Sequence, residues 1–170
     1  MTDSQIDARH FRNVLGHFPT GVTVVTGLDA AGVPHGITIG SFVSVSLDPP
    51  LVGFLPGVAS KSWQAIAESG SFCVNILAAG QDELCWKFAK EPAVGETSKF
   101  AGVDWTASAS GSPILPGIIG SIDCSVEVVH EAGDHLFVVG RVHGMSHADD
   151  VSDAMVFFRG KVASVNMPTA

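Results

Sequence analysis

Residues 35–50, HGITIGSFVSVSLDPP, decide the fold of this chain. Their odd-numbered positions are mostly apolar, whereas positions 38, 40, 44 and 46 carry threonine, glycine or serine. This alternation predicts a strand with one face in a hydrophobic core. The other face carries hydroxyls and a glycine where a solvent face would carry charged side chains, so a flat ligand could approach the backbone closely. The pattern alone leaves two interpretations open: the floor of a ligand site, or a serine- and threonine-rich edge strand.

Length and composition predict a single globular domain over residues 1–170. Hydrophobic residues make up 46% of the chain and charged residues only 15%, so the chain can bury a hydrophobic core. The low charge content suggests more buried surface than one small monomer can cover, and therefore predicts a symmetric homodimer. The formal net charge of −8 argues against nucleic acid or an anionic membrane as partner, because both require a basic surface.

The sequence shows no signal peptide and no apolar run near the ~18 residues of a membrane span, so we expect a cytoplasmic protein. The three cysteines are widely spaced and form no CxxC pair, which favours reduced structural thiols. The seven histidines show no metal-ligand spacing, so no metal site is expected.

Hydrophobic periodicity predicts a mainly β architecture. We expect a helix at 4–17 capped by Asp3 or Ser4, a helix at 59–70 capped by Ser60 or Ser62, and a helix at 81–90. Besides 35–47, strands are expected at 22–26, 51–55, 71–77, 118–130, 135–145 and 155–165, with a short one at 103–106. No strand–helix–strand rhythm occurs, so these elements predict an antiparallel barrel.

Three short segments carry residue types that bind ligands. Ser60-Lys61-Ser62 opens a predicted helix, where free amides, hydroxyls and an ammonium suit a phosphate, although the segment taken alone favours a capped helix with a solvated lysine. Residues 133–135, Gly-Asp-His, form a predicted hairpin tip. Turns favour glycine and aspartate for conformational reasons, so only His135 remains to be explained, and a histidine can donate to a ligand. In residues 157–160, Phe-Phe-Arg-Gly, aromatic rings and an arginine could flank a heterocycle or form a core strand with an outward arginine.

No nucleophile elbow or paired-carboxylate motif stands out, so the sequence favours binding of a cofactor that performs its own chemistry. Seven segments together resemble one family, the short-chain flavin reductases of two-component flavin-dependent monooxygenases, which have a flavin-binding split β-barrel fold. These segments are residues 18–26, 36–52, 60–66, 72–77, 111–115, 133–142 and 157–161.

The resemblance implies a homodimer that uses NADH, or less readily NADPH, to reduce FAD or FMN. The reduced flavin then diffuses to a separate monooxygenase. It implies that His135 is the catalytic residue that faces the nicotinamide. It also implies that the flavin is bound by Thr20, Thr38, Ile39, Gly40, Ser41, Ser44, Val45, Ser46, Ser60, Lys61, Ser62, Trp63, Phe88, Lys90, Phe158 and Arg159.

Two other functions stay open, and a departure from the family favours the first of them. Relatives often have tyrosines where Phe158 and Val162 stand, and this chain contains no tyrosine. A flavin-binding barrel that acts as a carrier or sensor without turnover is therefore one alternative. A relative of the pyridoxamine-phosphate oxidases, which share the barrel, is another.

Overall fold

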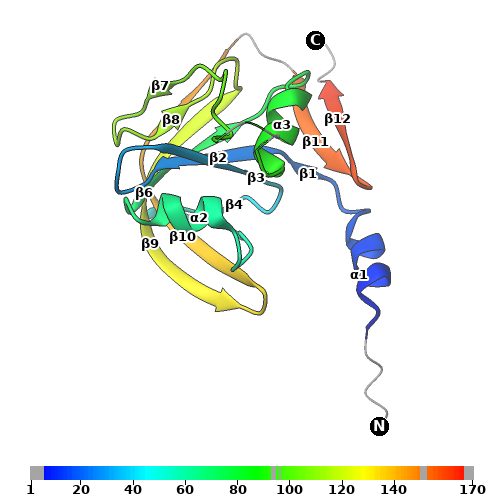
Figure 1. Ribbon diagram of the computed structural model, residues 1–170. Helices are drawn as coiled ribbons and strands as arrows, with labels where there is room; N and C mark the ends of the chain where they lie inside the picture. The colour runs from blue at the N-terminus through cyan, green and yellow to red at the C-terminus, as the bar shows by residue number, and fades with distance from the viewer. Residues whose placement is uncertain (1–5, 93–94, 96, 150–152, 167–170) are drawn as a thin grey trace.

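The computed structural model describes residues 6–92, 95, 97–149 and 153–166. Within these residues the protein is mainly β, with short helices and antiparallel strand pairs (Figure 1). The helices are α1 (Ala8–Leu15), α2 (Lys61–Ala67) and α3 (Asp82–Ala89). The strands are β1 (Thr20–Gly21), β2 (Thr23–Leu28), β3 (Pro34–Ile39), β4 (Val43–Leu47), β5 (Pro50–Phe54), β6 (Ser71–Ile76), β7 (Thr106–Ala107), β8 (Pro113–Ile114), β9 (Gly120–Ala132), β10 (His135–His147), β11 (Asp153–Phe158) and β12 (Lys161–Asn166).

A seven-stranded sheet in the order β3-β2-β6-β9-β10-β5-β4 forms the body of the protein. Strands β3 and β4 follow one another in the chain, yet they lie at opposite edges of this sheet. Only residues 40–42 join them. At about 3.5 Å per residue, the connection spans at most about 14 Å from the end of β3 to the start of β4. The two edges of the sheet must therefore approach each other at these residues, which we call the crossover.

The prediction of one continuous strand over 35–47 is wrong at the crossover. Ile39 at the end of β3 is buried, at 4% exposure, but Leu47 in β4 is 91% exposed. Strand β4 pairs only with β5, and a register shift between Ser44 and Ser46 interrupts this pairing. As an edge strand with an irregularity, β4 does not keep its odd-numbered side chains in the core.

The prediction of one strand over 155–165 is also wrong, because this segment is the hairpin β11–β12. Its turn consists of Arg159 and Gly160, with φ angles of +50° and +78°. Positive φ at both central residues is the signature of the two-residue turns that join antiparallel strands. Strand β1 extends this hairpin into a three-stranded sheet. The strand predicted at 103–106 is wrong too, since pairing begins only at Thr106, in the small sheet β7–β8.

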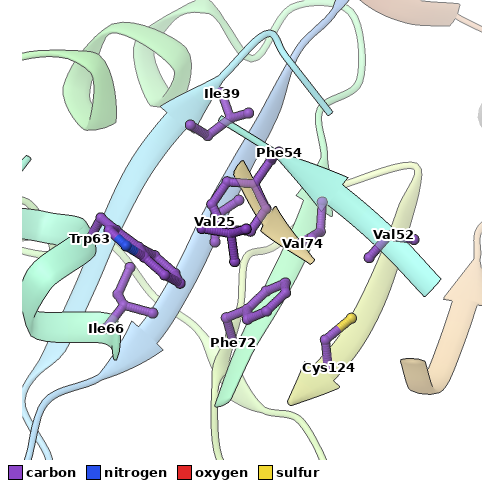
Figure 2. Packing of buried hydrophobic residues seen from close by; sticks show 10 residues of the cluster. Val25, Ile39, Val52, Phe54, Trp63, Ile66, Phe72, Val74 and Cys124 are labelled. Atoms are coloured by element: carbon purple, nitrogen blue, oxygen red, sulfur yellow. The ribbon is translucent and has the colours of Figure 1, made fainter. Parts of the chain in front are cut away.

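Two clusters of buried side chains fill the core. The first lies between the large sheet and α2, where the rings of Phe54, Trp63 and Phe72 pack edge to face with centroids 5.2–6.4 Å apart (Figure 2). The second lies under α3 and includes Phe88, whose ring is 4.9 Å from that of Phe100. The predicted helices at 59–70 and 81–90 are thus confirmed, and Ser60 caps α2 by accepting a hydrogen bond from the Trp63 amide at 3.2 Å.

Helix α1 stands apart from the sheet (Figure 1). Asp7 caps it, with Oδ2 accepting from the His10 amide at 2.8 Å, so the predicted caps Asp3 and Ser4, which lie outside the described residues, are not the caps. None of its residues is buried, and the side chains of Phe11 and Val14 are both more than half exposed. The helix is therefore amphipathic, as predicted, but its apolar face is not part of either core cluster.

The cysteines Cys73, Cys85 and Cys124 are all free and buried. Burial raises the pKa of the Cys73 and Cys124 thiols to about 12 in each case. None of the described helices is long and apolar enough to cross a membrane.

The contact of the Phe72 ring with β10, which it reaches across β9, generates a stability prediction. A Cβ atom at Gly140 would collide with the ring of Phe72, whereas a Cβ at Gly144 of the same strand meets nothing within 4 Å. We expect Gly140→Ala to lower the free energy of unfolding by about 1–3 kcal/mol, since a packed core resists extra volume. Gly144→Ala is the matched control and should change it by less than about 0.5 kcal/mol. Urea unfolding followed by tryptophan fluorescence measures both, and equal stabilities would contradict the packing described.

Candidate functional site

The first part of the site is a hollow of about 330 Å³ between β2, β3, α3 and β11. We call it the aromatic hollow, because Trp86 and Phe157 line it with their rings edge to face at 6.4 Å. Its other walls are Val22, Ile37, Thr38, Gly40, Cys85 and Ala89. Thr38 is held in place by donating its hydroxyl hydrogen to the Cys85 carbonyl at 2.7 Å. The result is a mostly apolar space that suits a flat aromatic ring.

A second hollow of about 630 Å³ adjoins the first at Gly40, which lines both. We call it the crossover hollow; it is lined by Leu15, Phe18, Pro19, Thr20, Gly21, Gly40, Ser41, Phe42 and Val43. A Cβ atom on Gly40 would lie 3.0 Å from the Thr20 hydroxyl oxygen. Gly40 thus keeps the wall between the two hollows thin, and a ligand can lie across it.

A third hollow of about 240 Å³, the lysine hollow, lies where the start of α2 meets β3. Lys61, Ser62, His35 and Lys99 line it together with one acidic residue, Glu91. The Lys99 ammonium donates to the Phe88 carbonyl at 3.0 Å, and burial lowers the pKa of this lysine. Two ammonium groups and a hydroxyl around one hollow suit an anion such as a phosphate.

Helices α2 and α3 both pack against β3. The lysine hollow and the aromatic hollow follow each other along this strand. Residues 33–36 line the lysine hollow, and residues 37 and 38 line the aromatic hollow. A ligand that carries a ring and a phosphate can therefore use both hollows along one strand.

Several predicted site residues line these hollows with their side chains or main chain: Thr20, Thr38, Gly40, Ser41, Lys61 and Ser62. The side chains of Ile39, Trp63 and Phe88, by contrast, lie in the core at 4%, 2% and 0% exposure. These three residues can offer a ligand only their main-chain atoms. Ser60 is engaged as the cap of α2.

The remaining predicted residues border the site without lining these three hollows. Ser44, Val45 and Ser46 lie on the edge strand β4. The Lys90 ammonium lies over the Trp86 ring, 5.4 Å from its centroid. Phe158 and Arg159 lie at the β11–β12 turn.

His135 begins β10 directly after the turn at Gly133 and Asp134, as predicted. Its Nδ1 lies 2.7 Å from a carboxylate oxygen of Asp134, and this hydrogen bond lowers the pKa of Asp134. The next residue, Leu136, donates its amide to the Pro56 carbonyl at 2.9 Å. The Ser41 hydroxyl in turn accepts from the Leu55 amide at 3.0 Å. The segment at 55–56 thus lies between His135 and the crossover. Because neighbouring hydrogen-bonded chains lie about 4.8 Å apart, His135 is about 10 Å from the crossover.

Trp86 and Lys99 are residues of the site that were not predicted from sequence, and neither forms part of a ligand motif. Phe157 belongs to the predicted aromatic segment 157–160, although Phe158 and Arg159 were the residues chosen from it. Their convergence depends on how α3, the loop after it and β11 pack around β3. Among the described residues, no group of three or more histidine, cysteine, aspartate or glutamate side chains could hold a metal ion.

A mostly apolar hollow beside a lysine-lined one, on an antiparallel β domain, is the arrangement expected of a protein that binds a phosphorylated heteroaromatic cofactor. Comparison with known proteins agrees with this class. The model of the flavin reductase like domain matches residues 15–166, and the chain belongs to this family.

Two curated relatives give the degree of similarity. The chain is 48% identical to the reductase subunit HsaB of a flavin-dependent monooxygenase from Rhodococcus jostii, over 94% of this chain and 79% of the relative. It is 40% identical to the FMN reductase (NADH) SmoA of Agrobacterium fabrum, over 91% of this chain and 84% of the relative.

Two solved structures have the same fold. A homologue of nitrilotriacetate monooxygenase component B from Mycobacterium thermoresistibile superposes with a TM-score of 0.87 and 44% identity, over 95% of this chain and 90% of that one. An NADH:FAD oxidoreductase of Streptomyces globisporus, in complex with NAD and FAD fragments, superposes with a TM-score of 0.85 and 33% identity, over 98% and 99% of the two chains.

The shared wall at Gly40 generates a binding prediction. In Gly40→Val a branched side chain would fill the space between the aromatic and crossover hollows. We expect the flavin dissociation constant to rise about tenfold, since overpacking a tight contact costs 1–3 kcal/mol, and about 1.4 kcal/mol is a factor of ten. Quenching of flavin fluorescence measures the affinity, with Gly144→Val as the control. An unchanged affinity would show that the flavin lies elsewhere.

Proposed function

We propose that this chain transfers hydride from NADH to FAD, with FMN accepted, and releases the reduced flavin to a separate monooxygenase. Membership of the flavin reductase family makes the chain an oxidoreductase that acts on flavin. The choice of FAD and NADH is supported by the Streptomyces oxidoreductase, and acceptance of FMN by the Agrobacterium reductase. NADPH is the less favoured donor.

The observation that carries this proposal is the aromatic hollow with Gly40 at its rim and the lysine hollow beyond it on β3. The isoalloxazine would lie in the aromatic hollow, along the backbone of Thr38, Ile39 and Gly40. Lys61, Ser62 and Lys99 would hold the flavin phosphate. The edge residues Ser44, Val45 and Ser46 would border the part of the flavin that extends from the crossover.

Three further features belong to the same proposal. The short crossover between opposite sheet edges supports a split β-barrel, in a single domain over residues 1–170. The uncovered apolar face of α1 and the open edge of β4 support a homodimer. The three free thiols support a reducing compartment, the cytoplasm.

The protein's own contribution to the reaction is positioning. A bound flavin supplies the ring that accepts the hydride, and the apolar walls of the aromatic hollow would keep water away from it. His135 would orient the nicotinamide. Because the carboxylate of Asp134 only accepts hydrogen bonds, the proton of the ring lies on Nδ1, and Nε2 can accept from the nicotinamide carboxamide.

Oxidation of NADH by the purified protein, supplied in turn with FAD, FMN and riboflavin, tests the proposed activity. We expect rapid loss of NADH absorbance with FAD and FMN, and weaker use of riboflavin because it lacks the phosphate. Flavin binding without oxidation of NADH would contradict the proposed reductase activity and indicate a carrier or sensor.

His135→Ala tests the role of this histidine. We expect the KM for NADH to rise about tenfold while the KM for FAD changes little, since the lost hydrogen bond serves only the nicotinamide. His130→Ala, which removes an exposed histidine from the other arm of the same hairpin, is the control. A larger rise in the KM for flavin than for NADH would contradict the assignment.

A further inference from the structure

Helix α1 carries an apolar stripe that the described part of the chain leaves uncovered. Phe11, Val14 and Leu15 share one side of the helix, because they are spaced at i, i+3 and i+4. Each of these side chains is more than half exposed. The helix is nevertheless anchored, since the Gly16 carbonyl at its end accepts a hydrogen bond from the Arg159 amide at 2.8 Å. An apolar stripe is the side that a helix buries against another element.

A second uncovered surface lies at the end of the β9–β10 hairpin. We call residues 127–134 the hairpin arm, because β6 pairs with β9 only up to Ser125 and β5 pairs with β10 only over residues 138–141. Every residue of the arm is exposed. Val138, in the first core cluster, is fully buried, whereas its register partner Val129 on the arm is 42% exposed. The apolar face of the sheet therefore continues from the core onto the arm, where the described chain leaves it uncovered.

The two surfaces are placed so that a second copy of the chain can cover both. Helix α1 and the hairpin arm project beyond the large sheet at the same end of the molecule (Figure 1). A twofold axis at this end would set α1 of each copy against the arm of the other, and the same contact would form twice. One chain thus supplies both sides of the interface.

Charge favours α1 of a second copy as the occupant of the arm. The arm contains three acidic residues and neither lysine nor arginine. Glu131 shares the face of Val129, two residues away, and has no ion-pair partner among the described residues. On α1, Arg12 lies beside the stripe, three residues before Leu15, and likewise has no ion-pair partner in that part of the chain. Two copies of α1 would bring arginines together, and two arms would bring carboxylates together, whereas α1 on the arm pairs opposite charges.

The stripe of α1 leads directly into the proposed flavin site. Leu15, at its end, lines the crossover hollow together with Phe18, three residues later. Phe11 and Val14 do not line this hollow. The side chains of Leu15 and Phe18 are 54% and 73% exposed, so this wall of the hollow is itself largely uncovered. A contact that holds Phe11 and Val14 therefore also fixes the position of the wall.

We propose that α1 of one copy packs on the hairpin arm of a second copy, and that this contact couples dimerisation to flavin binding. Phe11 and Val14 cover Val129 of the second copy. Arg12 forms an ion pair with Glu131 of the second copy. The proposal rests on the proposed function for the homodimer and for a flavin that extends into the crossover hollow. Because coupling between two binding events is reciprocal, flavin strengthens the dimer by the same factor by which the dimer strengthens flavin binding.

Sedimentation equilibrium of charge-reversal variants tests the interface. Arg12→Glu and Glu131→Arg should each raise the dimer dissociation constant about tenfold, since each reversal replaces attraction by repulsion at two symmetric contacts. The double variant should return to within about threefold of the wild type, which a mere loss of helix in Arg12→Glu would not allow. Asp104→Arg, which reverses an exposed acid outside both surfaces, is the control. A monomeric wild type, or a double variant no tighter than the single variants, would overturn the proposal.

Phe11→Ser tests the coupling, because this residue lies on the stripe but not on the wall of the hollow. We expect the dimer to weaken and the dissociation constant of FAD to rise about fivefold, which is the lower range of coupling between sites. Saturating FAD should tighten the wild-type dimer by the same factor. Val165→Ser, which removes a similarly exposed apolar side chain from β12, is the control.

Two outcomes separate this inference from the proposed function. Equal FAD affinity of Phe11→Ser and the wild type, with a weakened dimer, would overturn the coupling. A charge swap that restores the dimer of a protein without any flavin binding would support the packing of α1 on the arm and overturn the proposed function.

Discussion

The three-residue connection at residues 40–42 is the constraint on which the rest of the structure depends. It joins strands at opposite edges of a seven-stranded sheet, so the sheet must bring these edges together. Ser41 satisfies the backbone at this point, since its hydroxyl oxygen lies within hydrogen-bond distance of both the amide and the carbonyl of Leu55. Gly40 lacks the side chain that would separate the two hollows on either side of it. The same short segment therefore brings the two edges of the sheet together and leaves the aromatic and crossover hollows connected.

Much of the fold can be predicted from hydrophobic periodicity, and the errors of that prediction have physical causes. The strands near 22–26 and 71–77 are correct because each is buried over nearly its whole length. The two strands within 118–145 are correct although each runs from buried to exposed, because they pair with each other on both sides of a turn at Gly133. The prediction of one continuous strand within residues 35–50 is wrong, because alternation shows which side chains share a face but not where the strand ends and leaves the core. The segment at 155–165 fails because its turn contains Arg159, which is uncommon at a position with positive φ.

The candidate site could be predicted only in part. Its floor follows from residues 38–41, and Lys61 and Ser62 follow from a helix start. The two-residue period of a strand also explains why Ile39 faces the core: Thr38 and Gly40 line the aromatic hollow, so their neighbour must face the opposite side. Trp86 and Lys99 could not be assigned, because nothing in their local sequence shows that α3 and the loop after it converge on β3.

The walls of the aromatic and crossover hollows come from segments that are far apart in the chain, from residue 15 to residue 157. These hollows exist only after residues 40–42 have taken their place beside Thr20 and β11 has paired with β1. A flavin that binds there would stabilise only the folded state, by about 2.7 kcal/mol when its concentration is a hundredfold above the dissociation constant. The supply of flavin in a cell would then help to determine how long this protein survives proteolysis.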